Sequence, residues 1–287
     1  GVTFRIVDKA AEAGTTSRAV GVQARTLEFY RQLGLADDVV AAGSPARALN
    51  FWVQGDRRGR MELGDVGSGL SPYPYLLIYP QDVHEKLLID KLGAFGVDVE
   101  RPVELVALEQ RGERVAATVR HDDGALEIVD AAYAAGCDGA RSFVRGALGV
   151  GYPGGTYSHV FYVADVDASG PTTDGEAHFA VDDADNFLAC LAYGPRRVRL
   201  IGTVRDDAIA DGKELGFDDV KKEIFAHLRL HIDELHWFST YRVHHRVASS
   251  FRVGRCFLLG DAAHIHSPVG GQGMNTGIGD AVNLASA

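Results

Sequence analysis

The chain has 287 residues, of which 46% are hydrophobic, enough for one large core or two modest ones. Its 29 basic and 39 acidic residues give a formal charge of −10, which argues against a nucleic acid or an anionic membrane surface as the partner. A small organic ligand fits this charge better.

The predicted elements of the first half alternate between helix and strand patterns. In chain order they are a buried strand at residues 3–9, a helix at 21–34, a hairpin at 48–64, a helix at 81–96, and an antiparallel meander of strands at 103–110, 114–121 and 126–131. In the second helix, Val83, Leu87 and Phe95 are expected to form one apolar stripe.

The second half continues with the same two kinds of pattern. Its predicted elements are a strand passing into a helix at 131–149, several strands at 159–205, an amphipathic helix at about 218–230, a strand at 236–248, a buried strand at 255–264, and a helix that begins near Met274.

Strand-to-helix units with glycine junctions lie at the beginning, middle and end of the chain, and β-rich blocks separate them. We therefore predict an α/β fold. A discontinuous Rossmann-like domain would contain residues 1–47, 81–153 and 249–287, and an inserted antiparallel β-rich domain would contain residues 48–80 and 154–248.

Residues 260–284, GDAAHIHSPVGGQGMNTGIGDAVNL, carry the chemistry that is easiest to interpret. Gly271 lies too far beyond the strand end at Leu259 for a standard dinucleotide phosphate turn. Asp261 instead follows the strand, and Gly271 and Gly273 precede a helix whose first amides attract an anionic or electron-rich ring edge. An elongated cofactor with a polyol and a ring that becomes anionic would use both features, and a reduced flavin is such a cofactor.

This stretch resembles the signature that follows the last flavin-domain strand of the class A FAD-dependent aromatic hydroxylases. That family includes 4-hydroxybenzoate hydroxylase, phenol hydroxylase and the polyketide hydroxylases. Three further segments resemble the family in the same order along the chain, namely SRAVGVQARTLEFYRQLGL at 17–35, YPQDVHEKLL at 79–88 and CDGARSFVR at 137–145.

The resemblance implies FAD as cofactor and assigns roles to individual residues. Asp8 would bind the adenosine ribose, Asp261 the ribityl chain, and Pro268 would line the reactive ring. Arg246 matches an active-site arginine of some members. The other implied cofactor contacts are Arg18, Arg25, Gln81, Asp138, Gly271, Gly273, Met274 and Asn275.

The implied activity is hydroxylation of a phenolic or other electron-rich aromatic substrate through a flavin hydroperoxide, with NAD(P)H and dioxygen as co-substrates. Candidate pocket-wall residues are Tyr73, Tyr75, Phe187 and Tyr193, although core packing explains each of them equally well. A flavin-dependent halogenase is one alternative, but the surroundings of Trp52 and Trp237 do not resemble that group's tryptophan motif. A non-catalytic flavoprotein-like module that binds an aromatic ligand is the other.

The sequence departs from the family pattern in two places. The family begins with a strand and a GxGxxG loop that would precede Gly1, so we expect a fragment that lacks this unit and a C-terminal region. Some phenol-hydroxylating members carry an aspartate at the position of Val20, and valine cannot assist in deprotonating a phenol.

Simpler interpretations of the same residues stay open. Asp8 could be a solvated strand end, and Asp138 could cap the helix near Ser142. Arg18 could be a surface charge, Gln81 a helix cap, and Arg246 a partner in a surface ion pair.

Histidine and cysteine usage favours neither a metal site nor a disulfide framework. His264 and His266 lack a third ligand, so we expect no metal. The three scattered cysteines, Cys137, Cys190 and Cys256, favour a reducing compartment, and we expect the protein to be cytoplasmic. No apolar run is long enough to span a bilayer, and the sequence shows no secretory leader pattern.

Overall fold

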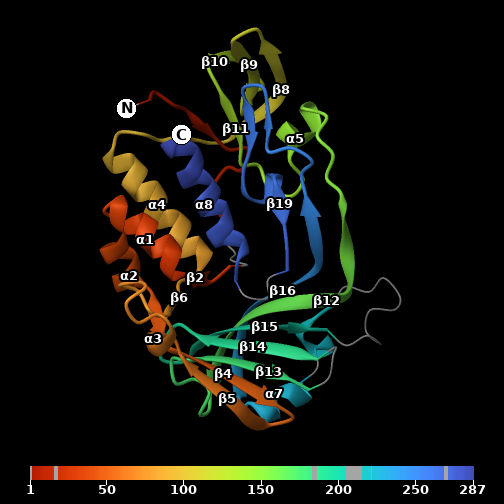
Figure 1. Cartoon of the computed structure of the whole chain (residues 1–287). Helices are drawn as coiled ribbons and strands as arrows, with labels where there is room; N and C mark the ends of the chain where they lie inside the picture. Colours follow the sequence, from red (N-terminus) through yellow and green to blue (C-terminus); the bar gives the residue numbers. More distant parts are fainter. Residues whose placement is uncertain (1, 16–18, 183–185, 205–214, 221, 268–270) are drawn as a thin grey trace. The chain divides into compact units, whose positions relative to one another are not determined.

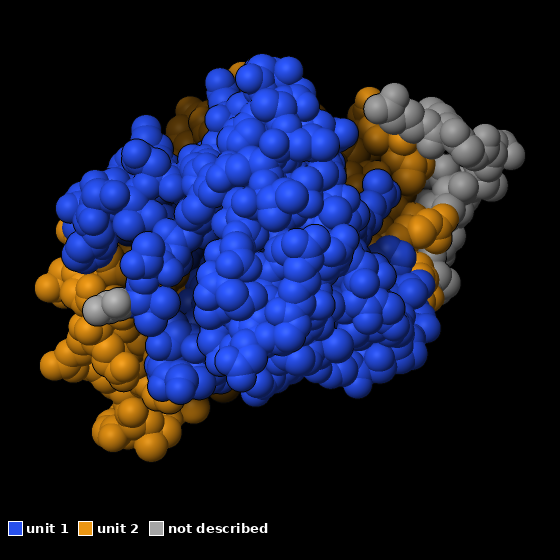
Figure 2. Space-filling view, turned by 90° about the horizontal axis from the view of Figure 1, so that it is seen from above, with its two compact units in different colours: residues 1–19, 81–155, 244–287 blue, residues 20–80, 156–243 orange. Residues whose placement is uncertain are grey.

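A computed structural model of the chain describes residues 2–15, 19–182, 186–204, 215–220, 222–267 and 271–287. The chain forms two compact units, which have different colours in Figure 2. Unit 1 contains Gly1–Ala19, Gln81–Gly155 and His244–Ala287, and unit 2 contains Val20–Pro80 and Thr156–Val243.

Unit 1 combines short parallel strand pairs with an antiparallel meander and helices, and Figure 1 shows the meander and the helices. Its elements are β1 (Ile6–Val7), α4 (Gln81–Ala94), β7 (Val99–Glu100), β8 (Val103–Arg111), β9 (Arg114–His121), β10 (Leu126–Ala131), β11 (Ala134–Gly136), α5 (Phe143–Ala147), β17 (Arg252–Val253), β18 (Cys256–Leu258), η2 (Gly260–Ala262), β19 (His264–Ile265) and α8 (Gly273–Ser286). β1 pairs with β7 and β11 pairs with β18, both in parallel. The meander has the order β10-β9-β8.

Unit 2 is dominated by one large sheet, which has the order β16-β12-β15-β14-β13-β4-β5 in this unit. Its elements are β2 (Gly21–Val22), α1 (Ala24–Gln32), α2 (Ala36–Ala42), β3 (Ser44–Ala46), β4 (Ala48–Val53), β5 (Asp56–Glu62), α3 (Leu63–Val66), β6 (Leu76–Ile78), β12 (Gly154–Ser169), β13 (Ala177–Val181), β14 (Phe187–Ala192), β15 (Arg197–Thr203), η1 (Phe217–Asp219), α7 (Glu223–His227) and β16 (His231–Val247). The pair β13–β4 is parallel, so the sheet is mixed rather than wholly antiparallel.

The two faces of this sheet carry different cores because side chains alternate along a strand. On β15, Val198 and Leu200 belong to the core that includes α7, whereas Ile201 packs against a second core around Ala46, Ile78 and Leu191. Both faces of the central strands are therefore covered.

Most predicted elements are confirmed, with two exceptions. The strand predicted as buried at 3–9 forms only β1, which is half-buried, while Phe4 is exposed, and the helix predicted at 218–230 is wrong in length. The chain forms only the short helices η1 and α7 there. Between them Val220 has an extended backbone and forms an isolated β-bridge with Val204, which interrupts the helix.

The apolar stripe predicted on α4 is also wrong. Val83 is 46% and Phe95 78% exposed, while His84 is only 2% exposed. Phe95 lies beyond the last residue of α4, and His84 is rotated by about 100° from Val83 around the helix, so a different face is buried.

The division into units differs from the predicted domains mainly at residues 20–47. These residues belong to unit 2 because β2 and β3 both pair with β6 in an antiparallel sheet. The α/β class is confirmed.

Within the described residues, no helix is both long enough and apolar enough to cross a membrane.

Candidate functional site

The parallel strands β11 and β18 end side by side in unit 1. Gly136 pairs with Leu258, and the Leu259 amide donates to the Gly136 carbonyl at 3.0 Å. Each strand is followed within three residues by a carboxylate, Asp138 after β11 and Asp261 after β18. Because parallel strands present their carboxyl ends at one sheet edge, the two loops start from the same edge.

The carboxylate of Asp138 caps the helix that follows it. It accepts a hydrogen bond from the Ser142 hydroxyl at 2.5 Å and another from the Val144 amide at 3.0 Å. Gly136 permits this tight turn, since a Cβ there would lie 2.7 Å from the Val144 side chain. The capping interpretation of Asp138 is thus supported, and because a carboxylate has about four acceptor positions, capping leaves others for a ligand.

The loop that carries Asp261 is fixed through its backbone. The Tyr152 hydroxyl donates to the Asp261 carbonyl at 2.7 Å, and the Arg145 guanidinium donates to the Ala262 carbonyl at 2.9 Å. Arg145 also stacks over the Tyr152 ring, 3.8 Å from its centroid. Burial raises the pKa of Tyr152 to about 12, so its hydroxyl stays a donor at neutral pH. The Asp261 side chain itself is exposed.

Arg246 joins the same cluster from the end of β16, where residues 244–247 belong to unit 1. It pairs in antiparallel register with Ile265 of β19, and its guanidinium donates to the Tyr152 carbonyl at 3.3 Å. The structure therefore brings Arg246 close to the residues that hold the Asp261 loop.

The start of α8 has the backbone features predicted from its glycines. Gly271 has φ of +62° and open space around the position of a Cβ. The Asn275 side-chain amide donates to the Gly271 carbonyl at 2.7 Å and so braces the turn. The Gln272 side chain does not cap the helix, which leaves the first-turn amides of Gly273 and Met274 directed beyond the helix end. Pro268 lies outside the described residues.

Asp8, at the end of β1, sits in a small ionic cluster. Its carboxylate accepts from the Ala10 amide at 2.9 Å and pairs with Arg101 at 3.0 Å. Arg101 also contacts Glu85 at 3.1 Å and the Glu12 carbonyl at 2.5 Å. Asp8 is therefore a carboxylate that neighbouring groups hold in place, with a side chain that is 39% exposed.

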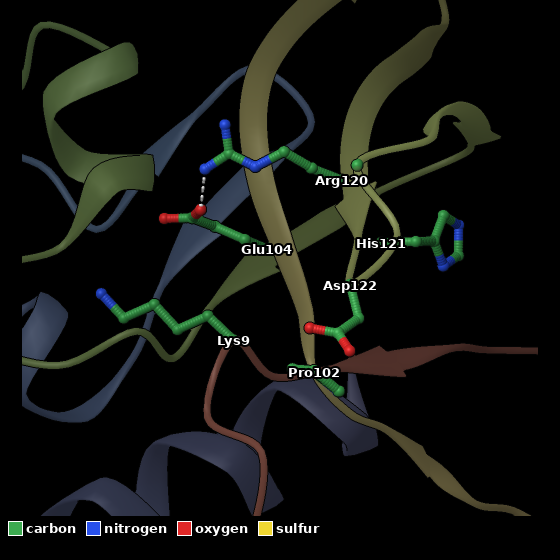
Figure 3. A pocket seen from close by; sticks show the side chains of 7 residues that line it. Lys9, Pro102, Glu104, Arg120, His121 and Asp122 are labelled. Atoms are coloured by element: carbon green, nitrogen blue, oxygen red, sulfur yellow. Dashed lines mark hydrogen bonds and ion pairs between the residues drawn. The ribbon is translucent and has the colours of Figure 1, made fainter.

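A hollow of about 440 Å³ lies beside this cluster (Figure 3). The residues that line it are Lys9, Pro102, Glu104, Arg120, His121, Asp122 and Gly124. Arg120 hydrogen-bonds Glu104 in this wall, and charges of both signs surround the space. None of the predicted site residues lines the hollow, although Lys9 follows Asp8 directly.

Three predicted contacts near the N-terminus have different outcomes. Gln81 begins α4, and its side-chain oxygen accepts a hydrogen bond from the Ala19 amide at 3.3 Å; because Ala19 lies outside the helix, this contact is not the helix cap of the simpler interpretation. Arg25 is in unit 2, where it pairs with Glu28 at 2.9 Å. Arg18 lies outside the described residues.

The four predicted aromatic wall residues, Tyr73, Tyr75, Phe187 and Tyr193, are half-buried in unit 2. Tyr73 and Tyr75 contact each other edge to face, with centroids 6.3 Å apart. Tyr193 and Phe179 both pack against the core around Ala46, Ile78 and Leu191, and the rings of Phe187 and Phe179 stack with centroids 6.4 Å apart. Burial raises the pKa of Tyr193 to about 12.

Beside Tyr193 lies a buried ion pair that sequence reasoning did not predict. Arg199 is 1% exposed and binds Asp165 through two contacts, at 2.8 and 2.6 Å. The guanidinium lies 5.9 Å from the Tyr193 ring centroid. Within β15 this arginine alternates with valine and leucine, and that alternation was the available signal.

Two groups of residues have side chains of the types that bind metal ions. His264 and His266 stack with centroids 5.9 Å apart rather than converging on a point. Asp167, Glu234 and His236 do cluster in unit 2, but Asp167 is already paired with Arg197 at 2.9 Å. A cation there would meet that guanidinium.

Sequence reasoning also missed the residues that support the predicted site. They are Arg101, Arg145, Tyr152, His264 and Asp280. Arg145 and Asp280 stand inside motifs that resemble the family. The partner of Arg145 lies 117 residues away, and the contacts of Asp280 with Gly260 and His264, within one motif, follow no helix or strand periodicity.

The family model described as an FAD binding domain matches residues 1–287, the whole chain. The chain is 36% identical to 6-methylpretetramide 4-monooxygenase of Streptomyces rimosus, and the match covers 99% of this chain and 51% of that protein. It is 34% identical to a flavin-dependent monooxygenase of Mycobacteroides abscessus, over 99% of this chain and 62% of that protein. The chain thus spans about half to three-fifths of the length of these relatives.

A solved structure shares the fold of the whole chain. It is p-nitrophenol 4-monooxygenase from Pseudomonas putida, with a TM-score of 0.85 and 23% identity, and the match covers 100% of this chain and 73% of that one.

Proposed function

Because the chain belongs to the FAD binding domain family, we propose that it supplies the FAD-binding and substrate-binding parts of a monooxygenase that hydroxylates a phenolic or other electron-rich aromatic compound. Unit 1 would bind FAD and unit 2 would bind the substrate. The co-substrates would be dioxygen and NAD(P)H, and the protein would work in the cytoplasm. The observation that carries the proposal is the family match along the whole chain together with the Asp261 loop and the α8 start that the structure describes.

The residues of unit 1 fit FAD in three respects. Asp261 offers an exposed carboxylate to hydroxyl groups, and Asp8 offers a second carboxylate held by Arg101. The amides of Gly273 and Met274 begin a 14-residue helix, whose N-terminus favours negative charge. Gly271 leaves open space beside them, so a ring can approach the backbone.

The bound FAD supplies the redox chemistry toward dioxygen that no side chain can provide. The residues of this chain bind and orient. In this proposal Asp261 accepts hydrogen bonds from polyol hydroxyls, and the α8 amides stabilise negative charge without needing to reorganise. The half-buried aromatic residues of unit 2, Tyr193 and Phe187 among them, exclude water from an aromatic substrate.

The test uses the full-length protein with FAD and a panel of phenols. We expect a substrate to stimulate NAD(P)H oxidation and the product to gain one oxygen atom that carries the label from ¹⁸O₂. A product that instead gains a halogen would support a halogenase. Binding of an aromatic compound without NAD(P)H oxidation would support a non-catalytic module.

A further inference from the structure

Asp280 connects α8 to the loop that carries Asp261. One oxygen of its carboxylate accepts two hydrogen bonds, from the Gly260 amide at 2.9 Å and from Nε2 of His264 at 2.7 Å. Gly260 immediately precedes Asp261, and His264 lies three residues after it. The carboxylate therefore holds the Asp261 loop at both of its ends.

Two glycines bring the helix and the loop into backbone contact at the same place. A Cβ built on Gly277 would lie only 3.3 Å from the Cα of Gly260. Gly260 also has φ of +55°, a conformation that glycine adopts most readily. Gly277 is four residues, or about one turn, from the start of α8 at Gly273. The contact thus lies directly behind the helix N-terminus.

Burial gives an independent sign that this arrangement serves more than packing. His264 is 8% exposed, and its Nδ1 atom is buried without a hydrogen-bond partner among the described residues. A buried polar atom without a partner costs free energy, so a purely structural contact would be better served by an apolar side chain.

We propose that Asp280, His264, Gly260 and Gly277 form a clamp that fixes the Asp261 carboxylate relative to the first amides of α8, with Asp280 as its positioning residue. The inference rests on the proposed function, because it treats Asp261 and the α8 start as two contacts of one FAD molecule. A cofactor that must meet both groups at once binds tightly only if their separation is set before binding.

The experiment measures FAD binding to the full-length apoprotein by fluorescence titration, the visible circular dichroism of bound FAD, and the melting temperature of the apoprotein. We expect Asp280→Ala to raise the FAD dissociation constant about tenfold or more, as for the loss of charge-assisted hydrogen bonds, and to change the circular dichroism. Asp280→Asn keeps an acceptor oxygen but not the charge, so its affinity should lie between those of the wild type and Asp280→Ala.

Two further variants test the clamp without removing the carboxylate. Gly277→Ala should weaken FAD binding because the added Cβ pushes the helix away from Gly260. His264→Gln should weaken binding as well, and the His264→Gln/Asp280→Ala double variant should be no weaker than Asp280→Ala alone, because both residues act through one contact. Ser286→Ala, which removes a hydrogen bond to the Val282 carbonyl near the end of α8, is the matched control and should bind normally.

The inference is overturned if Asp280→Ala and Gly277→Ala lower the melting temperature but leave the dissociation constant and the circular dichroism unchanged. If Asp280→Ala does not fold, the same test is applied to Gly277→Ala and His264→Gln. The inference is then overturned if these two variants leave the FAD dissociation constant and the circular dichroism unchanged. Wild-type protein and Asp261→Ala are titrated in the same buffer. If Asp261→Ala also binds FAD normally, the proposed FAD site itself is wrong, and the clamp inference fails with it.

Discussion

The loops after β11 and β18 begin at one sheet edge and carry the same kind of side chain, yet the two loops are held in different ways. Asp138 turns back onto its own chain and accepts hydrogen bonds from Ser142 and Val144. In the other loop the backbone of Asp261 and its neighbours is held by Tyr152, Arg145 and Asp280, and the Asp261 side chain is exposed. The comparison shows that the Asp138 carboxylate stabilises its own loop, whereas other residues stabilise the Asp261 loop through its backbone.

The buried side chain of His84 should make the folded protein less stable at acidic pH, so variants of the two loops need to be compared near pH 7. Burial lowers the pKa of His84 from 6.5 to about 4, so between these values the unfolded chain binds a proton that the folded chain does not. Stability that is complete above pH 6.5 is lost as the pH falls toward 4, by about 3 kcal/mol. We expect this loss in urea unfolding of the wild type at neutral and acidic pH, and a smaller one in His84→Asn. An equal loss of stability in the wild type and in His84→Asn would show that His84 is not its cause.

Replacement of Asp261 should have the largest effect on the cofactor. In the full-length protein, Asp261→Ala removes the acceptor for FAD hydroxyls and should weaken binding about thirtyfold, or about 2 kcal/mol. The apoprotein should melt normally, because its loop is held through other atoms. Full flavin absorbance after gel filtration of this variant would contradict the assignment.

Replacement of Asp138 should have the opposite pattern. Asp138→Ala removes the acceptor of the Ser142 hydroxyl and the Val144 amide at the start of α5 and should lower the free energy of unfolding by about 1.5 kcal/mol. FAD affinity should fall less than in Asp261→Ala. Urea unfolding and flavin titration of both variants check this, and a larger affinity loss for Asp138→Ala would reverse the roles of the two loops.

The smallest predicted effect concerns the support of the Asp261 loop. Tyr152→Phe removes the hydrogen bond to the Asp261 carbonyl and should raise the FAD dissociation constant about fivefold, or about 1 kcal/mol. The control is Tyr133→Phe, because Tyr133 is exposed and its ring contacts the guanidinium of Arg255, which lies 5.1 Å from the ring centroid. Equal affinity of the two variants would show that Tyr152 does not position this loop.

The sequence was sufficient for features that depend on local pattern. Strand ends, the glycines before α8 and the meander β8-β9-β10 all follow from short-range periodicity and turn residues. The supporting contacts could not be predicted in this way. Arg145 reaches Ala262 across 117 residues, and Tyr152 reaches Asp261 across 109, so only the folded chain brings them together.

Burial was predicted least well where polar and apolar residues alternate without a clear stripe. His84 in α4 and Arg199 in β15 are almost fully buried, although histidine has no strong preference for burial and arginine is rarely buried without a partner. The Arg199 charge is compensated by Asp165 on a different strand, and no pattern within β15 indicates that partner.

Hydrogen exchange of the full-length protein, with and without FAD, tests the central claim most directly, because it reports which backbone amides the cofactor covers. We predict that FAD slows exchange most strongly in peptides that contain residues 260–267 and 271–276. Peptides that contain residues 137–147 should change less, because their amides are already held by the Asp138 and Ser142 cap. Protection confined to residues 137–147, with none at the Asp261 loop or the start of α8, would contradict the account.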